Sequence, residues 1–178
     1  AGLLLARIAI HARAYKEAEK LLRRVVEYAP RFTLAWHELG AALREQHRDQ
    51  EAAEAMEISL KMDPNDSTTH YQYGAALAMA GRTEESARAY QRSVELDPKQ
   101  AGAHVGLGHV LKTLGDQAGG IAAYRAAIDL KPNLGEIYFS LSNLKTFRFA
   151  ADEIDDMVNR IGQESLPSTS VVHFAFTL

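Results

Sequence analysis

Two groups of residues in this sequence have the types or spacing that phosphate binding or metal binding would use. Gly106 and Gly108 form a Gly-x-Gly with Gly102 upstream, and phosphate loops use glycine so that backbone N–H groups can approach the phosphate oxygens. These glycines fall within a stretch predicted to be helical, no strand precedes it and no Gly-Lys-Ser/Thr follows it. His104 and His109 could be zinc ligands, but their spacing along the chain puts them on different faces of a helix. We therefore interpret the histidines as packing residues and expect no phosphate site.

An acidic cluster could bind a cation. It consists of Asp152, Glu153, Asp155 and Asp156. The alternative is a charged helix N-terminus, which the helix dipole favours, and this is the interpretation that we prefer. The sequence thus predicts no catalytic residue, no metal site and no cofactor in this chain, which we expect not to be an enzyme by itself.

The elements that would carry these residues follow a repeat. Pro30, Pro64, Pro98 and Pro132 are evenly spaced along the chain, and the residues between them repeat their character. Each interval has two apolar-periodic stretches separated by a short turn, and each proline ends the second stretch because its ring cannot continue a helix. This pattern predicts helix, turn, helix and stop in every unit.

The period and the pattern resemble the tetratricopeptide repeat, a helical hairpin with the same spacing between units. The signature falls in three registered copies on Trp36, Leu39, Gly40, Leu43, Ala52, Met56, Ser59 and Pro64; on His70, Tyr73, Gly74, Leu77, Ser86, Tyr90, Ser93 and Pro98; and on His104, Leu107, Gly108, Leu111, Gly120, Tyr124, Ala127 and Pro132. The resemblance implies an all-α fold, a right-handed superhelical solenoid of antiparallel helix pairs.

Glycines at one register position indicate close helix packing. A glycine inside a helix costs about 1 kcal/mol relative to alanine, so Gly40, Gly74 and Gly108 need a compensating contact. We expect first helices near 33–46, 67–80 and 101–114, and second helices near 49–62, 83–96 and 117–130. Asp49, Thr83 and Asp116 are the predicted N-caps of the second helices, and Gly81 and Gly115 are the predicted turn residues. The turn at 46–48 lacks such a glycine and should be less ideal.

The repeats give a domain organisation. We expect a repeat array over 1–162, with units at about 1–32, 33–66, 67–100 and 101–134 and a degenerate unit at 135–162. We expect the beginning of the first unit to be either missing or degenerate. Residues 163–170 should form a loop around Pro167, and Val171 to Leu178 should open a further helix leading to a C-terminal domain outside this chain.

Composition narrows the classes of partner. The chain has 178 residues, 47% of them hydrophobic and 24% charged, with a net charge of −3 and no cysteine. The interspersed charges give no basic patch for nucleic acid or anionic membranes, and no class of partner follows from charge. The tetratricopeptide resemblance implies a protein or peptide partner. The lack of cysteine is compatible with any compartment; we expect a cytoplasmic location. The sequence specifies no oligomeric state.

The C-terminal part has a second resemblance. The stretch from Tyr138 to Phe149, followed by Asp152-Glu153-Ile154, Met157 and His173-Phe174-Ala175, looks like the end of the repeat array in bacterial tetratricopeptide-repeat sulfotransferases. That resemblance implies a following domain that uses 3'-phosphoadenosine-5'-phosphosulfate, of which this chain would be the non-catalytic arm. The alternative is a free-standing scaffold or co-chaperone-like adaptor.

In proteins of the tetratricopeptide type, the first helices line a concave groove. By register, the groove-facing candidates for ligand or peptide binding are His37, Arg44, Tyr71, His109, Lys112, Phe139 and Asn143. Phe139 and Val105 stand where the carboxylate clamp of some co-chaperones needs lysine, so that clamp is not matched. Tyr71 is the expected anchor, since it stands beside the small Ala75 and Ala78; the alternatives are that it packs against the neighbouring repeat and that the groove residues are merely solvated.

Overall fold

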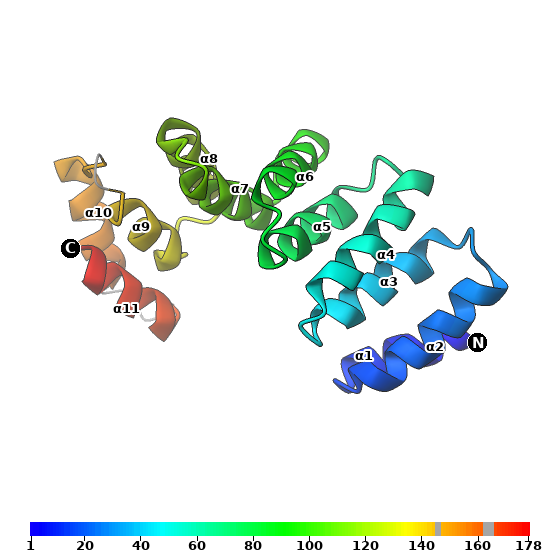
Figure 1. Cartoon of the computed structure of the whole chain (residues 1–178). Coiled ribbons are helices and arrows are strands. Elements are labelled where there is room, and N and C mark those ends of the chain that lie inside the picture. Colours follow the sequence, from blue (N-terminus) through cyan, green and yellow to red (C-terminus); the bar gives the residue numbers. More distant parts are fainter. Residues whose placement is uncertain (145–146, 162–165) are drawn as a thin grey trace. The chain divides into compact units, whose positions relative to one another are not determined.

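The computed structural model describes residues 1–144, 147–161 and 166–178, which form eleven α-helices and no strand (Figure 1). Their bounds are α1 (Gly2–His11), α2 (Tyr15–Tyr28), α3 (Thr33–Arg44), α4 (Asp49–Met62), α5 (Ser67–Met79), α6 (Thr83–Leu96), α7 (Ala101–Thr113), α8 (Gln117–Leu130), α9 (Gly135–Ser142), α10 (Ala151–Ile161) and α11 (Ser168–Thr177). The chain divides into two compact units, Ala1–Pro98 and Lys99–Leu178. The predicted all-α fold and the helices of the three clear repeats are confirmed.

The first unit is a stack of three helical hairpins. Helices α1 and α2, α3 and α4, and α5 and α6 pack as pairs, and α2 and α4 also contact the first helix of the next pair. Helix α3 lies against both α1 and α5, so the first helices are neighbours. The shared core is built from alanine and leucine, for example Ala18, Leu22, Leu39, Leu43 and Leu77. Small residues alternating with leucine allow the helices to approach closely while still burying apolar area.

The glycine seam is confirmed in both units. A Cβ added at Gly74 would stand 3.0 Å from the Tyr90 ring, and one at Gly108 would stand 2.6 Å from the Tyr124 ring. Ser86, a small signature residue of the second helix in this repeat, donates a hydrogen bond of 2.7 Å to the Gly74 carbonyl oxygen. The helices of each pair therefore touch where the first helix has no side chain.

The turns also follow the prediction. Gly81 and Gly115 have φ of 77° and 85°, in the region that only glycine enters without strain. The corresponding position in the turn without glycine is His47, at φ 59°, which is the expected less ideal turn.

The predicted caps are correct in one of three cases. Asp116 caps α8 and accepts a hydrogen bond from the Gly119 backbone N–H at 2.9 Å. Asp49 and Thr83 were wrong by one position, because each is the first residue of its helix and the caps are Arg48 and Arg82. The side chains of these arginines make no cap hydrogen bond; each instead pairs with a glutamate in the first turn of its helix.

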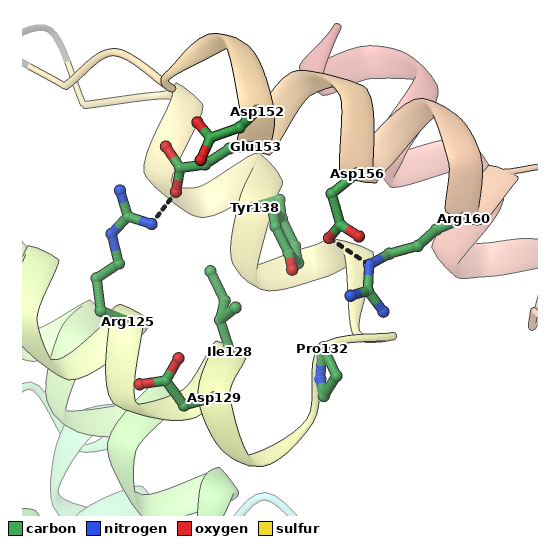
Figure 2. A pocket seen from close by; sticks show the side chains of 9 residues that line it. All are labelled: Arg125, Ile128, Asp129, Pro132, Tyr138, Asp152, Glu153, Asp156 and Arg160. Atoms are coloured by element: carbon green, nitrogen blue, oxygen red, sulfur yellow. Dashed lines mark hydrogen bonds and ion pairs between the residues drawn. The ribbon is translucent and has the colours of Figure 1, made fainter.

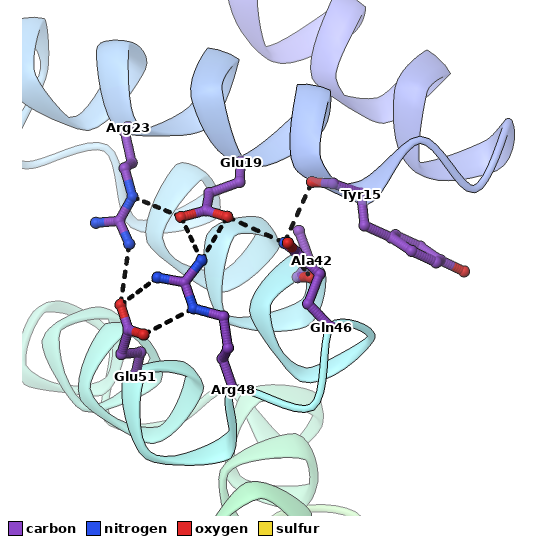
Figure 3. A network of polar contacts seen from close by, with 7 residues as sticks. All are labelled: Tyr15, Glu19, Arg23, Ala42, Gln46, Arg48 and Glu51. Carbon is purple, nitrogen blue, oxygen red and sulfur yellow. Dashed lines mark hydrogen bonds and ion pairs between the residues drawn. The ribbon is translucent and has the colours of Figure 1, made fainter.

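Arg48 joins α2 and α4 of the first unit through charge-assisted hydrogen bonds (Figure 3). Its guanidinium donates to Glu51 at 2.6 and 2.7 Å and to Glu19 of α2 at 2.7 and 2.8 Å. Glu19 also accepts from Arg23 at 2.8 Å and from Gln46 at 3.1 Å. Burial raises the pKa of Glu19, but the hydrogen bonds from its partners outweigh burial and hold the pKa below its usual value.

The second unit begins as a regular hairpin and then departs from the repeat. Helices α7 and α8 form a pair, and α9 contacts α8, as in the first unit. Helix α9 then packs mainly along α11, and a Cβ on Gly135 would stand 2.5 Å from the Ser170 carbonyl oxygen. Helix α10 reaches this core through Met157, which clusters with Tyr138, Leu166 and Phe174.

The last helix begins earlier than expected. Helix α11 starts at Ser168, directly after Pro167, whereas the sequence predicted a loop up to residue 170. Proline is tolerated at the N-terminal end of a helix, because the first backbone N–H groups there have no partner within the helix. Residues 163–165 of the expected loop lie outside the described residues.

Candidate functional site

In the first unit, the predicted groove residues Arg44 and Tyr71 lie around one aromatic ring. The Tyr71 ring packs on that of Tyr90, with centroids 6.1 Å apart and a tilt of 49°. Burial raises the pKa of Tyr90, Tyr71 adds to the increase, and the positive charge of Arg44 opposes it. Tyr90 is 5% exposed, while Tyr71 and Arg44 remain half-buried. Tyr71 therefore packs within its own repeat and keeps part of its ring at the surface.

His37, also predicted as a groove residue, is held by the next repeat. Its Nδ1 lies 2.6 Å from Thr69 Oγ1, which donates to Asp66 Oδ2 at 2.5 Å. Because the Thr69 proton is directed to Asp66, the His37 Nδ1–H must donate to Thr69, which fixes the tautomer. His37 thus links α3 to the start of α5, and its remaining nitrogen, Nε2, is the ring atom that a ligand would meet.

In the second unit, His109 lies on Tyr124. The two rings meet edge to face with centroids 5.4 Å apart, and the Tyr124 hydroxyl lies 2.7 Å from His109 Nδ1. Burial lowers the pKa of His109 and the charge of Lys112 lowers it further, whereas Glu136 acts in the opposite direction. Burial raises the pKa of Tyr124 to about 12, so its hydroxyl is neutral at physiological pH. This pair is held by an internal hydrogen bond, while Lys112 is exposed.

Phe139 lies on α9, where α11 packs, and Asn143 is the C-cap residue directly after α9. Phe139 contacts the His173 ring with centroids 5.8 Å apart and is 37% exposed. Asn143 Nδ2 donates to the Phe139 carbonyl oxygen at 2.8 Å, so the side chain helps to end its own helix. Thr146, a further groove position by register, lies outside the described residues.

Sequence reasoning missed the partners that hold these residues. Tyr90 and Tyr124 occupy the same signature position in successive repeats and were predicted only as signature residues. Each also supports a groove candidate on the first helix. The register contained that information, because both positions face the first helix of the same hairpin. His173 had no such signal, since it lies outside the repeat.

The described part of the chain has no cluster of metal ligands and no membrane-spanning helix. No group of three or more His, Asp or Glu side chains there could hold a metal ion, and no helix there is long and apolar enough to cross a bilayer. In the acidic cluster, Glu153 pairs with Arg125 and Asp156 pairs with Arg160.

With the geometry established, comparison with known proteins decides the family. A model of the tetratricopeptide repeat matches residues 3–67 and 71–135. The chain belongs to the tetratricopeptide repeat family. The two matched segments together cover nearly all of the three clear repeats and extend to Gly135, the first residue of α9.

Solved structures agree with this fold, whereas no curated protein matches the sequence. A crystal structure of MamA aligns with a TM-score of 0.75 at 19% identity, covering 97% of this chain and 91% of that chain. MamA from Desulfovibrio magneticus RS-1, residues 41 to the end, aligns with 0.70 at 21% identity over 74% of each chain. YrrB, described as a tetratricopeptide protein with an unusual peptide-binding site, aligns with 0.76 at 16% identity, covering 99% of this chain and 91% of that chain. At these identities the likeness shows the fold alone.

Proposed function

We propose that this tetratricopeptide chain is a non-catalytic module that binds a protein or peptide on the first-helix faces of its units. The observation that supports this most is the surface around Tyr71. Its ring is partly exposed, it is supported from beneath by Tyr90, and Ala75 and Ala78 follow it one and two turns along α5. An aromatic ring that is already fixed loses little side-chain entropy when it binds, and aromatic anchors dominate binding energies at interfaces.

The polar neighbours define what such a peptide would present. Arg44 lies near enough to Tyr90 for its charge to act on that hydroxyl, and its own partner, Glu45 at 3.3 Å, is a surface ion pair that a ligand could replace at little cost. His37 keeps Nε2 for a further hydrogen bond. In the tautomer set by Thr69, Nε2 is an acceptor. A segment with an apolar side chain, an acidic or carbonyl acceptor for Arg44 and an N–H or O–H donor for His37 fits this face. YrrB provides a precedent for peptide binding in the family.

The test starts from a partner captured by the full-length protein and identified by mass spectrometry. We expect Tyr71→Ala to weaken its affinity about 30-fold, since truncating an anchor costs about 2 kcal/mol. Tyr28→Ala is the matched control because Tyr28 is 82% exposed at the end of α2, on a second helix. Asn143→Ala can be compared in the same way with Asn159→Ala, an exposed residue of α10.

The second helices provide the opposing surface. Glu57→Lys and Arg92→Glu reverse charges that lie on α4 and α6, in exposed ion pairs with Lys61 and Glu95. We expect these variants to bind as the wild type does. Loss of binding in the charge reversals, with intact binding and fold in Tyr71→Ala, would assign the partner to the second-helix surface instead.

We further propose that the array is the N-terminal arm of a sulfotransferase that uses 3'-phosphoadenosine-5'-phosphosulfate. The support is the resemblance of residues 138–149, 152–154, 157 and 173–175 to the end of such arrays, and the alternative is a free-standing scaffold or co-chaperone-like adaptor. The gene sequence after Leu178 separates them: a strand with a phosphate-binding loop favours the first, and more repeats or a stop codon favour the second. The chain by itself should not bind adenosine 3',5'-bisphosphate in a calorimetric titration.

A further inference from the structure

A cavity of about 440 Å³ opens between α8, α9 and α10 in the second unit, away from the residues assigned to peptide binding (Figure 2). Helix α8 contributes Arg125 and Asp129 to its lining, and α10 contributes Asp152, Glu153, Asp156 and Arg160. The aromatic ring of Tyr138 enters from α9. The cavity therefore combines charged groups from two helices with one aromatic hydroxyl.

The charges of the lining do not balance. Four carboxylates and two guanidinium groups surround the cavity, so two negative charges are left over. Both arginines are already paired, Arg125 with Glu153 and Arg160 with Asp156, the latter at 2.6 Å (Figure 2). Within the described part of the chain, Asp129 and Asp152 have no ion pair. A cation is favoured in such a cavity and an anion is not.

Tyr138 supplies a separate indication of a ligand. The residue is 4% exposed, yet its hydroxyl makes no hydrogen bond to any residue that the structure describes. The ring is enclosed while the hydroxyl oxygen itself reaches the cavity, so a ligand there can take it as a hydrogen-bond partner. Packing fixes the ring against Phe149 and Phe174, with centroids 6.0 and 4.9 Å away, and directs it into the cavity (Figure 2).

The protonation state of the Tyr138 hydroxyl allows it to accept a hydrogen bond from an N–H donor. Burial raises the pKa of Tyr138; of the neighbouring charges, Asp156 and Glu153 add to the increase and Arg160 and Arg125 oppose it. The hydroxyl is therefore neutral at physiological pH and keeps lone pairs that can accept a hydrogen bond.

The dispersion of the carboxylates argues for an organic cation. In the described residues, no three acidic groups are close enough to hold a metal ion, so the negative charge is spread along the cavity rather than focused at one point. Ile128 and Pro132 add an apolar part to the wall. A chain of methylene groups with a charged nitrogen at its end matches both features.

We propose that this cavity binds an alkylammonium group, with the Tyr138 hydroxyl accepting one N–H, Asp129 and Asp152 compensating the charge, and Ile128 and Pro132 covering the methylene groups. Two sources have this chemistry: the side chain of a lysine in a peptide and a free diamine. The proposal goes beyond the peptide-binding function, since it concerns a different surface and a different recognition chemistry.

The experiment is a calorimetric titration of the whole chain at low salt with two probes, 1,5-diaminopentane and Nα-acetyl-lysine-N-methylamide. The uncharged norleucine analogue of the second probe is the ligand control. We expect saturable binding of at least one charged probe, no binding of the norleucine analogue, and weaker binding as salt is added. Tighter binding of the lysine compound identifies a peptide lysine as the source, and tighter binding of the diamine identifies a free diamine.

Three variants test the assignment of the site. Tyr138→Phe removes only an unpaired hydroxyl, so the fold should be kept while the charged probe binds about tenfold more weakly, as for the loss of a hydrogen bond to a charged group. Asp129→Asn should also weaken binding. Asp155→Asn is the matched control, because Asp155 is exposed on α10 and does not line the cavity.

Three results would overturn the proposal. They are the absence of binding by both charged probes up to about 10 mM, a range in which even millimolar affinity is visible; equal binding of the norleucine analogue; and wild-type affinity in folded Tyr138→Phe and Asp129→Asn. Circular dichroism and thermal unfolding of each variant establish that the fold is kept.

Discussion

Replacing Gly108 with alanine tests the packing on which the repeat depends. The added Cβ would lie 2.6 Å from Tyr124 Cε1 and 2.7 Å from Cδ1, which is closer than carbon atoms can approach. Tyr124 is 0% exposed, and its hydroxyl is held by His109 at 2.7 Å. The ring cannot move away without disturbing the core around it.

Two effects of opposite sign decide the magnitude. Inside a helix, alanine is about 1 kcal/mol more favourable than glycine in intrinsic helix propensity. Overpacking of a well-filled core costs about 1–3 kcal/mol. The clash involves the side of a fixed ring rather than the end of a flexible chain, so we expect the upper half of that range and a net loss of about 1 kcal/mol in the free energy of unfolding.

Urea denaturation followed by circular dichroism measures this difference, with Gly102→Ala as the matched control. Gly102 lies on the same helix, α7, and is exposed, so alanine there should stabilise by up to about 1 kcal/mol. The two substitutions should therefore shift the midpoint in opposite directions.

A double-mutant cycle isolates the contact with the ring. Tyr124→Leu removes the atoms that the new Cβ would meet, so in that background Gly108→Ala should become neutral or stabilising. If Gly108→Ala stabilises the wild type as Gly102→Ala does, or costs the same in both backgrounds, the close approach of α7 and α8 does not explain the glycine.

Two further predictions concern charge. Glu19→Ala should lower the free energy of unfolding by about 1 kcal/mol, because the Arg48 guanidinium then loses one of its two carboxylates in a partly screened network. Glu17→Ala is the control: its pair with Lys20 is exposed, so it should have no measurable effect in the same urea titration. The pKa of His109 is lowered in the folded state, so the unfolded state binds its proton first and stability should fall as the pH drops below about 6.5. His109→Gln should make urea midpoints between about pH 7.5 and pH 5.5 less dependent on pH. If the variant's midpoint changes with pH as steeply as that of the wild type, His109 is not the source of the pH dependence.

The sequence by itself determined the repeat. Pro64 and Pro98 mark helix ends, Gly81 and Gly115 mark turns with positive φ, and Gly74 marks the close approach within its hairpin. All of these features depend on contacts within one hairpin, and they recur at matching positions from one repeat to the next. Local rules applied three times in register reinforce one another, so the helix bounds and the seam could be predicted from residue types alone.

The sequence also placed the groove candidates on the first helix of each unit, but it could not tell which of them already have hydrogen-bond partners within the chain. One ring nitrogen of His37 is hydrogen-bonded to Thr69, and the side-chain amide of Asn143 is hydrogen-bonded to the backbone at the end of its own helix. A side chain's register gives its direction, whereas its free hydrogen-bonding capacity depends on which atoms of other helices come within about 3 Å.

Only the tertiary structure decided the C-terminal part. Helix α9 packs along α11, Met157 of α10 fills the core beside Tyr138, and the Tyr138 hydroxyl is left unpaired among charges from α8 and α10. These contacts join residues that follow no period, so each occurs once and no second copy reveals it. Burial, charge balance and an unsatisfied hydroxyl are properties of a packed arrangement, and they become visible only when residues distant in sequence are brought together.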